Sequence, residues 1–150
     1  MNSLEERIGY RFRERALLTR ALTTVGRSNE MGELSYDRNQ EALATLGDSV
    51  LRLLVVEHLI RRGVNRKGEI SQETSERVSA ASLSLVAERM ALEEFVHWGQ
   101  GEFVREEWHR SSRLLAECVE ALLGAVYLDG GLEGCRSVLE HIGFMGLPEE

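Results

Sequence analysis

The sequence has 150 residues, the length of a single domain that can bury a core. Its 43% hydrophobic and 29% charged residues are ordinary for a soluble globular protein, and its single proline and nine aromatic residues argue against a disordered tail or an all-β design. The formal net charge of −7 argues against a protein that holds nucleic acid by phosphate contacts alone. No apolar run approaches the roughly 20 residues of a membrane span, and the first residues include acids and arginines where a secretory signal is apolar. We therefore expect one cytoplasmic domain over residues 1–150, without a membrane partner.

Apolar side chains recur at helical spacing along most of the chain, and the sequence lacks strand-type alternation. Residues 26–37, rich in glycine and small polar residues, predict a loop. Gly63 and the Asp129-Gly130-Gly131 sequence mark the ends of two helices. The expected helices cover residues 4–8, 14–25, 39–62, 71–80, 83–90, 92–98, 111–128 and 132–142. The pattern therefore predicts an all-α, multi-helix fold.

The segment 113–128, RLLAECVEALLGAVYL, has apolar residues on every side, which is typical of a central helix packed all round. It nevertheless contains Glu117 and Glu120, which share one face because they are three residues apart. Cys118 lies between them and, like Cys135, is expected to be a buried thiol, since two cysteines make no disulfide framework. One face of a buried helix therefore carries two acids.

A second largely apolar helix, EALATLGDSVLRLLVV over residues 41–56, has Asp48 in its middle. Glu41 lies two turns earlier on about the same face. Apolar residues, Leu53 among them, predict that most of this helix is buried. Glycine in a helix interior costs about 1 kcal/mol relative to alanine, so Gly47 indicates that another helix crosses closely at this point.

Acids in two buried helices allow two interpretations. A carboxylate removed from water is usually paired or bound to a metal, and Arg52 or Arg113 could form a salt bridge with any one of these acids. A cluster of carboxylates from two helices instead favours a hard divalent cation such as Mg²⁺ or Mn²⁺, and such sites hydrolyse phosphate esters. The residues alone thus predict a hard-metal site between two helices.

Two longer motifs are similar to a known family. Residues 41–51, EALATLGDSVL, resemble the signature of the ribonuclease III family, which in typical members reads E-x-L-E-F-L-G-D-(S/A)-x-L. Residues 115–131, LAECVEALLGAVYLDGG, resemble that family's L-A-D-x-x-E-A-L-x-G-A-x-Y-L-D-x-G. Shorter matches are LEERIGYRF at 4–12, ALLTRALT at 16–23 and KGEIS at 67–71, so the resemblance covers nearly the whole chain in the family's order.

The resemblance implies an all-α ribonuclease III nuclease domain that forms a homodimer and receives double-stranded RNA in a valley across the dimer. Four acids per site would hold divalent metal, Mg²⁺ or Mn²⁺, and water would cleave the phosphodiester to a 5′-phosphate and a 3′-hydroxyl. Asp48 and Glu120 would be catalytic, and the metal ligands would be Asp48, Glu117 and Glu120, with Glu41 as an auxiliary acid. A bound cation would let so acidic a chain accept RNA.

Several features depart from the family's pattern. Ala44 stands where typical members have a metal-binding glutamate, one turn before Asp48. Glu117 replaces an aspartate, and its extra methylene moves the oxygens by roughly a bond length, which a near-octahedral Mg²⁺ site tolerates poorly. Thr23-Thr24 stand where many members have Thr-His. We also expect no double-stranded-RNA-binding domain after the last helix, and therefore weak, salt-dependent RNA affinity.

Ala44 leaves several interpretations open. The chain is an impaired endoribonuclease in which another group replaces the lost ligand, a nuclease silenced by an introduced substitution, or a non-catalytic relative that binds RNA or protein as a scaffold. An unrelated metal-dependent phosphohydrolase is a fourth reading that needs only the acid cluster. The sequence favours the endoribonuclease over the scaffold, and comparing cleavage of duplex RNA by this chain and by Ala44→Glu separates the two.

Overall fold

The computed structural model describes residues 3–33, 35–103 and 108–144. Within these residues the only strand-like pairing is one isolated bridge between Thr23 and His97, so the all-α prediction is confirmed. None of the described helices combines the length and apolar character needed to cross a bilayer. The elements are α1 (Leu4–Ile8), α2 (Arg15–Ala21), α3 (Val25–Glu30), the 3₁₀ turn η1 (Tyr36–Arg38), α4 (Glu41–Arg61), α5 (Lys67–Arg77), α6 (Ala80–Met90), the 3₁₀ turn η2 (Leu92–Glu94) and α7 (Trp108–His141).

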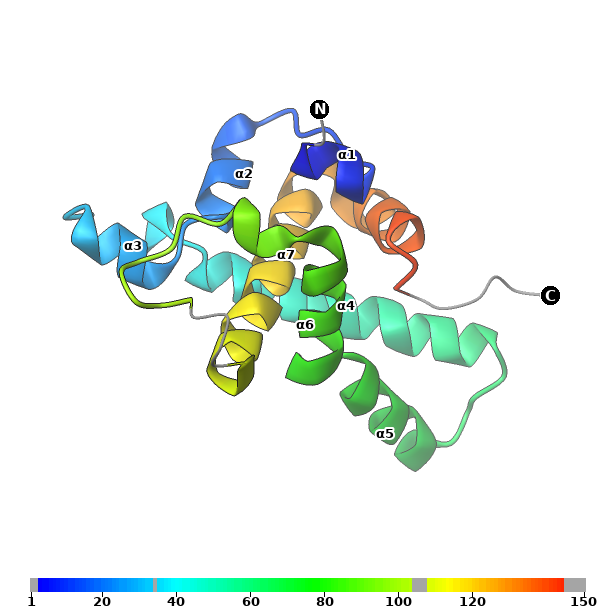
Figure 1. Ribbon diagram of the computed structural model, residues 1–150. Helices are drawn as coiled ribbons and strands as arrows, with labels where there is room; N and C mark the ends of the chain where they lie inside the picture. The colour runs from blue at the N-terminus through cyan, green and yellow to red at the C-terminus, as the bar shows by residue number, and fades with distance from the viewer. Residues whose placement is uncertain (1–2, 34, 104–107, 145–150) are drawn as a thin grey trace.

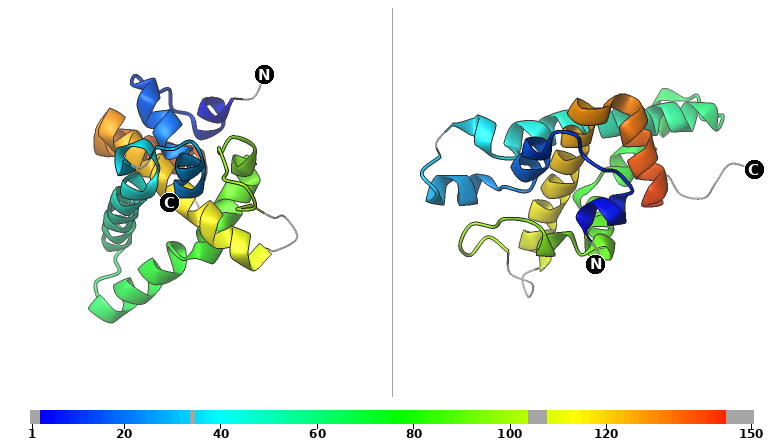
Figure 2. Two further views of the ribbon diagram at one scale, coloured as in Figure 1. Left: turned by 90° about the vertical axis from the view of Figure 1, so that its left-hand side faces the viewer. Right: turned by 90° about the horizontal axis from the view of Figure 1, so that it is seen from above.

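Helix α7 runs through the middle of the molecule, and α4 and α6 pack on different sides of it (Figures 1 and 2). Its most extensive contacts are with α4. Gly131, with φ 69° and ψ −168°, interrupts the helical backbone, so α7 consists of two helical segments joined by a kink. The sequence predicted these two segments and the break between them. The end of α4 and the whole of α5 project away from this body (Figure 1).

Helices α4 and α7 cross with their backbones in contact. A Cβ atom at Gly47 would overlap the carbonyl oxygen of Glu120, and one at Gly124 would overlap the carbonyl oxygen of Leu43. Only glycine at both positions permits this approach. The close helix crossing that Gly47 predicted is therefore confirmed, and it places the acid-bearing parts of α4 and α7 beside each other.

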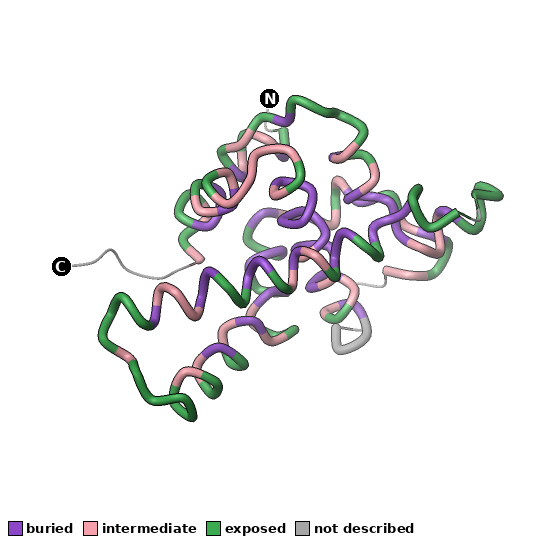
Figure 3. Tube along the Cα trace, turned by 180° about the vertical axis from the view of Figure 1, so that it is seen from behind, coloured by how far each residue is buried: buried purple, intermediate pink, exposed green. Residues whose placement is uncertain are grey.

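The burial of α4 differs between its two sides, as the alternating colours along it in Figure 3 show. Leu43, Leu51 and Leu54 are buried in the core. Leu53 and Ile60, however, are 52% and 50% exposed. The expectation that Leu53 helps to bury the helix is thus wrong for this chain by itself, because α7 covers only one side of α4.

The segment predicted as a loop over residues 26–37 contains helix α3, so that prediction is wrong in part. The hydroxyl of Thr24 accepts the backbone N–H of Arg27 at 3.0 Å and caps α3. The helix expected to reach residue 25 instead ends at Ala21, and the carbonyl of Leu22 accepts the N–H of His97 at 2.7 Å. His97, which is distant in sequence, therefore ends α2 before residue 25, where the apolar periodicity predicted that the helix would continue.

Two further boundaries differ from those expected. Helix α5 begins at Lys67 rather than Ser71, and Ser79 caps the following helix through the N–H of Ser82 at 3.2 Å. The helix expected over 92–98 is a single 3₁₀ turn, η2, because the chain then extends to pair with residues 22–24. The expectation of two buried thiols, by contrast, is confirmed.

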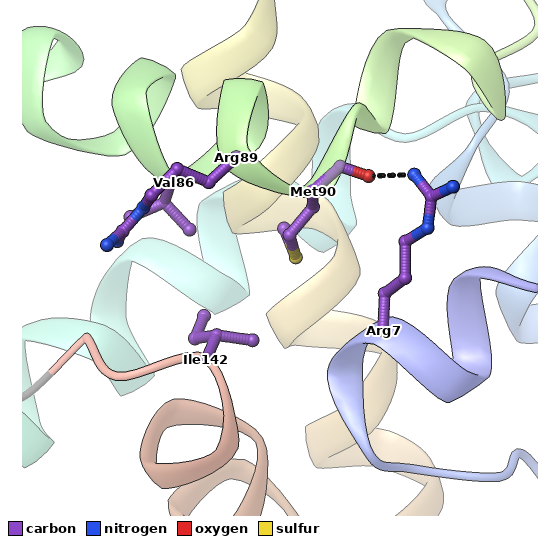
Figure 4. A pocket seen from close by; sticks show the side chains of 5 residues that line it. All are labelled: Arg7, Val86, Arg89, Met90 and Ile142. Carbon is purple, nitrogen blue, oxygen red and sulfur yellow. Dashed lines mark hydrogen bonds between the residues drawn. The ribbon is translucent and has the colours of Figure 1, made fainter. Parts of the chain in front are cut away.

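Helix α1 is attached to the end of α6 through Arg7. Its guanidinium donates to the carbonyl oxygen of Met90, as Figure 4 shows. The same guanidinium lies 5.0 Å from the ring centroid of Phe95. Beside this contact is a cavity of about 270 Å³ lined by Arg7, Val86, Arg89, Met90 and Ile142. None of the described residues that line it is acidic, so the cavity does not include the acids of α4 and α7.

Candidate active site

Two of the predicted acids meet at the α4–α7 crossing. Asp48 and Glu120 are partly buried on their two helices, and their carboxyl groups share a hydrogen bond. Burial, this hydrogen bond and the charges of Asp48 and Glu117 raise the pKa of Glu120 to about 8, while Arg52 opposes the shift. The ionised form of Glu120 is therefore disfavoured beside the carboxylate of Asp48.

Asp48 also has the salt-bridge partner that the sequence allowed. The Nε of Arg52, one turn further along α4, donates to the two carboxylate oxygens of Asp48 at 3.1 and 3.2 Å. Both side chains are substantially exposed, so this pair contributes only about 0.3–0.5 kcal/mol. Within the described residues, neither Glu117 nor Glu120 forms an ion pair. A salt bridge accounts for Asp48 but not for the acids of α7.

Glu117 lies one turn before Glu120 and is partly buried. Burial raises its pKa, and the negative charges of Glu41 and Glu102 raise it further. Glu41 itself is exposed at the start of α4. The fold therefore brings Glu117 near Glu41 and Glu102, whose negative charges disfavour the ionised form of Glu117.

Glu102 is the acid that the sequence analysis did not single out. Its carboxylate accepts the hydroxyl of Thr24 and the backbone N–H of Gly99, each at 2.5 Å. A side chain at Gly26 would collide with it. Glu102 thus holds the loop after η2 against the start of α3 while its charge acts on Glu117. It follows a helix-breaking Gly-Gln-Gly sequence and has no helical periodicity, so only long-range contacts reveal its place.

Buried amides that the sequence analysis also missed fix the start of α4. The Oδ1 of Asn39 accepts the N–H of Glu41 at 3.0 Å. The Nε2 of Gln40 donates to the carbonyl of Ala21 at 2.8 Å and lies 3.6 Å from the sulfur of Cys118. These contacts tie α4 to α2 and α7, and they set the rotation of α4 that turns Asp48 toward Glu120.

Ala44, one turn before Asp48, is only 5% exposed. Its methyl group belongs to the hydrophobic core, and it carries no atom that can bind a cation. A larger side chain at this position would have to extend from the core toward Asp48. The structure thus gives this position an apolar packing role.

The donor chemistry of the Asp48–Glu120 pair fits a hard divalent cation. Carboxylate oxygens are the ligands that Mg²⁺ and Mn²⁺ prefer, and a cation would offset both the burial and the neighbouring negative charges that raise the pKa of Glu120. Among the described residues, however, no group of three or more His, Cys, Asp or Glu side chains is arranged to hold a metal ion. The pair is therefore a two-carboxylate site, and the three-acid set of Asp48, Glu117 and Glu120 stays a prediction.

Comparison with known proteins places this chain in a family. A model described as "Ribonuclease-III-like" matches residues 14–145. Ribonuclease 3 of Caldanaerobacter subterraneus subsp. tengcongensis is 41% identical over 140 residues, which cover 91% of this chain and 59% of that protein. Ribonuclease 3 of Bordetella avium is 39% identical over 140 residues, which cover 93% of this chain and 52% of that protein.

Two solved structures of the nuclease domain of ribonuclease III from Campylobacter jejuni have the same fold, each with a TM-score of 0.78. They are 27% and 26% identical to this chain, cover 93% and 98% of it, and are themselves covered to 94% and 96%. This chain belongs to the ribonuclease-III-like family. It spans between half and three fifths of the length of the curated relatives it matches.

Proposed function

We propose that this chain is a metal-dependent endoribonuclease domain that hydrolyses phosphodiester bonds of double-stranded RNA. The observation that carries the proposal is the partly buried Asp48–Glu120 carboxyl pair at a helix crossing that only glycines permit. We propose that residues 1–150 form one domain, and that it acts in the cytoplasm, where its free cysteines would stay reduced.

In this proposal Asp48 and Glu120 would hold Mg²⁺ or Mn²⁺, which supplies an activated water and neutralises developing charge. Arg52 keeps the carboxylate of Asp48 in place through its hydrogen bonds. Glu117 and Glu41 add further negative charge near the pair, which would also favour a cation. The water oxygen bonds to phosphorus as the bond from phosphorus to the 3′ oxygen breaks. The departing oxygen takes a proton, so the products are a 5′-phosphate and a 3′-hydroxyl.

The outer side of α4 supports a homodimer. Small and apolar residues alternate at spacings of four and three, the pattern by which one helix packs along another. This outer stripe consists of Ala42, Leu46, Ser49, Leu53, Val56 and Ile60. All six are exposed or partly exposed in the single chain. For one of the Campylobacter jejuni structures, structural flexibility is described in a region involved in dimer formation. We propose that a second copy covers the stripe.

Cleavage of a perfectly paired, end-labelled RNA duplex in Mg²⁺ or Mn²⁺ tests the function. The wild-type chain is expected to cut the duplex, and Asp48→Asn with Glu120→Gln is expected to abolish the cut. Circular dichroism of the double variant must match the wild type. Intact duplex in both metals with the folded wild type and also with folded Ala44→Glu would refute the proposal.

The second candidate is a non-catalytic scaffold, which the buried apolar role of Ala44 favours. Restoring a carboxylate by Ala44→Glu separates the two candidates, since position 44 is one turn from Asp48. A nuclease is expected to gain on the order of 10²-fold in cleavage, because a transition-state contact is commonly worth a few kcal/mol. A scaffold would gain no cleavage and would lose stability in metal-free buffer.

A further inference from the structure

The cavity between α1, α6 and the turn after α7 has an arginine at each end and an apolar middle. Figure 4 shows Arg7 and Arg89 at its opposite ends, with the side chains of Met90 and Ile142 facing each other between them. Val86 completes the lining of this space of about 270 Å³. The cavity therefore combines two guanidinium groups with apolar walls.

Neither guanidinium group has an acidic partner among the residues that the structure describes. The hydrogen bond from Arg7 to a backbone carbonyl uses one of the five N–H donors of its guanidinium, and Arg89 is exposed to solvent. The acids of α1 are engaged elsewhere, since Glu5 pairs with Arg15 at 2.6 Å and Glu6 caps its own helix. Both positive charges therefore remain available to a ligand, in a chain whose net charge is −7.

The cavity is closed toward the core and continues along the surface of α6. Behind its apolar middle only about 20 Å³ of space remains, which is room for one water-sized sphere. On the other side, Val86 and Arg89 also line a neighbouring hollow of about 390 Å³. Leu85, which is 56% exposed, and Phe144 give that hollow apolar walls. Glu88 lines it too but forms no ion pair with a described residue. An elongated ligand can thus extend outward but not into the core.

This lining selects for a particular ligand chemistry. Two guanidinium groups repel metal cations and bind the oxygens of carboxylate, phosphate or sulfate. Apolar walls favour a ligand that also removes apolar surface from water, which an inorganic anion cannot do. Ligand sites for drug-sized molecules commonly measure roughly 300–1,000 Å³, so a cavity of about 270 Å³ suits a smaller molecule. The cavity therefore fits a small anion with an apolar body.

We propose that this cavity binds a small amphiphilic anion, whose charged head contacts Arg89 and whose apolar body lies between Met90 and Ile142. Arg89 takes the head because its guanidinium has no partner among the described residues. Arg7, already held by a backbone carbonyl, adds positive potential at the other end. The site goes beyond the proposed nuclease function, since no acid of the candidate active site lines the cavity.

Isothermal titration calorimetry with straight-chain carboxylates tests this site, because the head stays the same while the length of the apolar body changes. Octanoate is expected to bind with a Kd on the order of 0.1–1 mM, as suits so small a ligand. Hexanoate, which is two methylenes shorter, should bind roughly tenfold more weakly, and acetate should give no measurable binding. No binding of octanoate, or equal affinity for octanoate and hexanoate, would overturn the proposal.

Arg89→Gln tests the contact with the charged head. Losing a hydrogen bond between two charged groups should weaken octanoate binding about tenfold or more. Arg66→Gln is the matched control, since it makes the same change at an exposed arginine that does not line the cavity. It should bind octanoate as the wild type does. Equal affinities of Arg89→Gln and Arg66→Gln for octanoate would overturn the proposal.

Ile142→Trp tests the place of the apolar body, because the larger side chain would fill the cavity and should abolish octanoate binding. Thermal melts show whether this variant is folded, and if it is not, the comparison of Arg89→Gln with Arg66→Gln decides. Tighter octanoate binding by Glu149→Gln with Glu150→Gln would mean that acids of the chain itself compete for the cavity, and it would overturn the assignment to a small molecule. None of these measurements depends on cleavage of RNA.

Discussion

Both sides of α4 carry large apolar residues, but the two sides contact their surroundings in different ways. On the inner side, Gly47 lies so close to α7 that no methyl group fits. On the outer side, Leu53 and Ile60 remain about half exposed in the single chain. Hydrophobicity alone therefore does not tell which side of a helix faces its own core. The position of Gly47 indicates which side of α4 faces the core. Glycine is unfavourable in a helix interior, so its presence there marks a close approach of another backbone.

Replacing the inner glycine is expected to have the largest effect. Gly47→Ala would push a methyl group into the backbone of α7, which cannot move as a flexible side chain can, and should destabilise the fold by roughly 2–3 kcal/mol. Urea unfolding measures the change. Gly68→Ala in α5 is the control, since nothing lies within 4 Å, and it should stabilise the fold by a few tenths to about 1 kcal/mol. Similar changes in both variants would refute the close crossing.

The outer stripe should respond through association rather than folding. Leu53→Glu places a charge at the centre of the stripe in both copies, so the dimer is expected to weaken by roughly 100-fold or more. Sedimentation velocity at several protein concentrations measures this. Leu85→Glu changes an equally exposed leucine on α6 and should leave the dimer intact. A wild-type chain that is monomeric at micromolar concentration would contradict the dimer itself.

A smaller, pH-dependent effect is expected where polar contacts rather than close packing hold α7. Asp129 accepts the hydroxyl of Tyr10 at 2.7 Å and the backbone N–H groups of Arg13 and Glu14, each at 2.9 Å. The N–H of Arg13 and then the hydroxyl of Tyr10 lower the pKa of Asp129 below its usual value. Asp129→Asn should therefore cost about 1–2 kcal/mol at neutral pH.

The sign of this pH dependence follows from the lowered pKa. A carboxyl group whose pKa is depressed in the folded state contributes its stability above its ordinary pKa and loses it as pH falls through the folded value. The difference in stability between wild type and Asp129→Asn should therefore be constant near neutrality and shrink below about pH 4. Thermal melts at a series of pH values measure it, and a difference that grows on acidification would exclude this role for Asp129.

Local sequence signals predicted the parts of the fold that depend on neighbours along the chain. Helix α1 matches its predicted range, the break at Gly131 was predicted from the Asp129-Gly130-Gly131 sequence, and the close approach of α7 was predicted from Gly47. Those signals work because helix periodicity and glycine cost act over one or two turns. The same reasoning brought Asp48 and Glu120 together, since both are acids in apolar helices.

The parts that were missed depend on residues distant in sequence. Helix α2 ends early because residues 22–24 pair with His97, and Thr24 then caps α3. Glu102 reaches the site only because its loop is held against Thr24. The exposure of Leu53 depends on which side of α4 meets α7, and apolar content cannot specify that.

Binding of Mn²⁺ to metal-free protein tests most directly the central claim, that Asp48 and Glu120 form a divalent-cation site. Isothermal titration calorimetry should show weak binding to the wild type and its loss in Asp48→Asn and in Glu120→Gln. Glu69→Gln, which removes an exposed acid from α5, is the control and should bind as the wild type does. Millimolar Mn²⁺ should likewise raise the melting temperature of the wild type and of Glu69→Gln only. Wild-type affinity in Asp48→Asn and Glu120→Gln would contradict the claim and place the metal elsewhere.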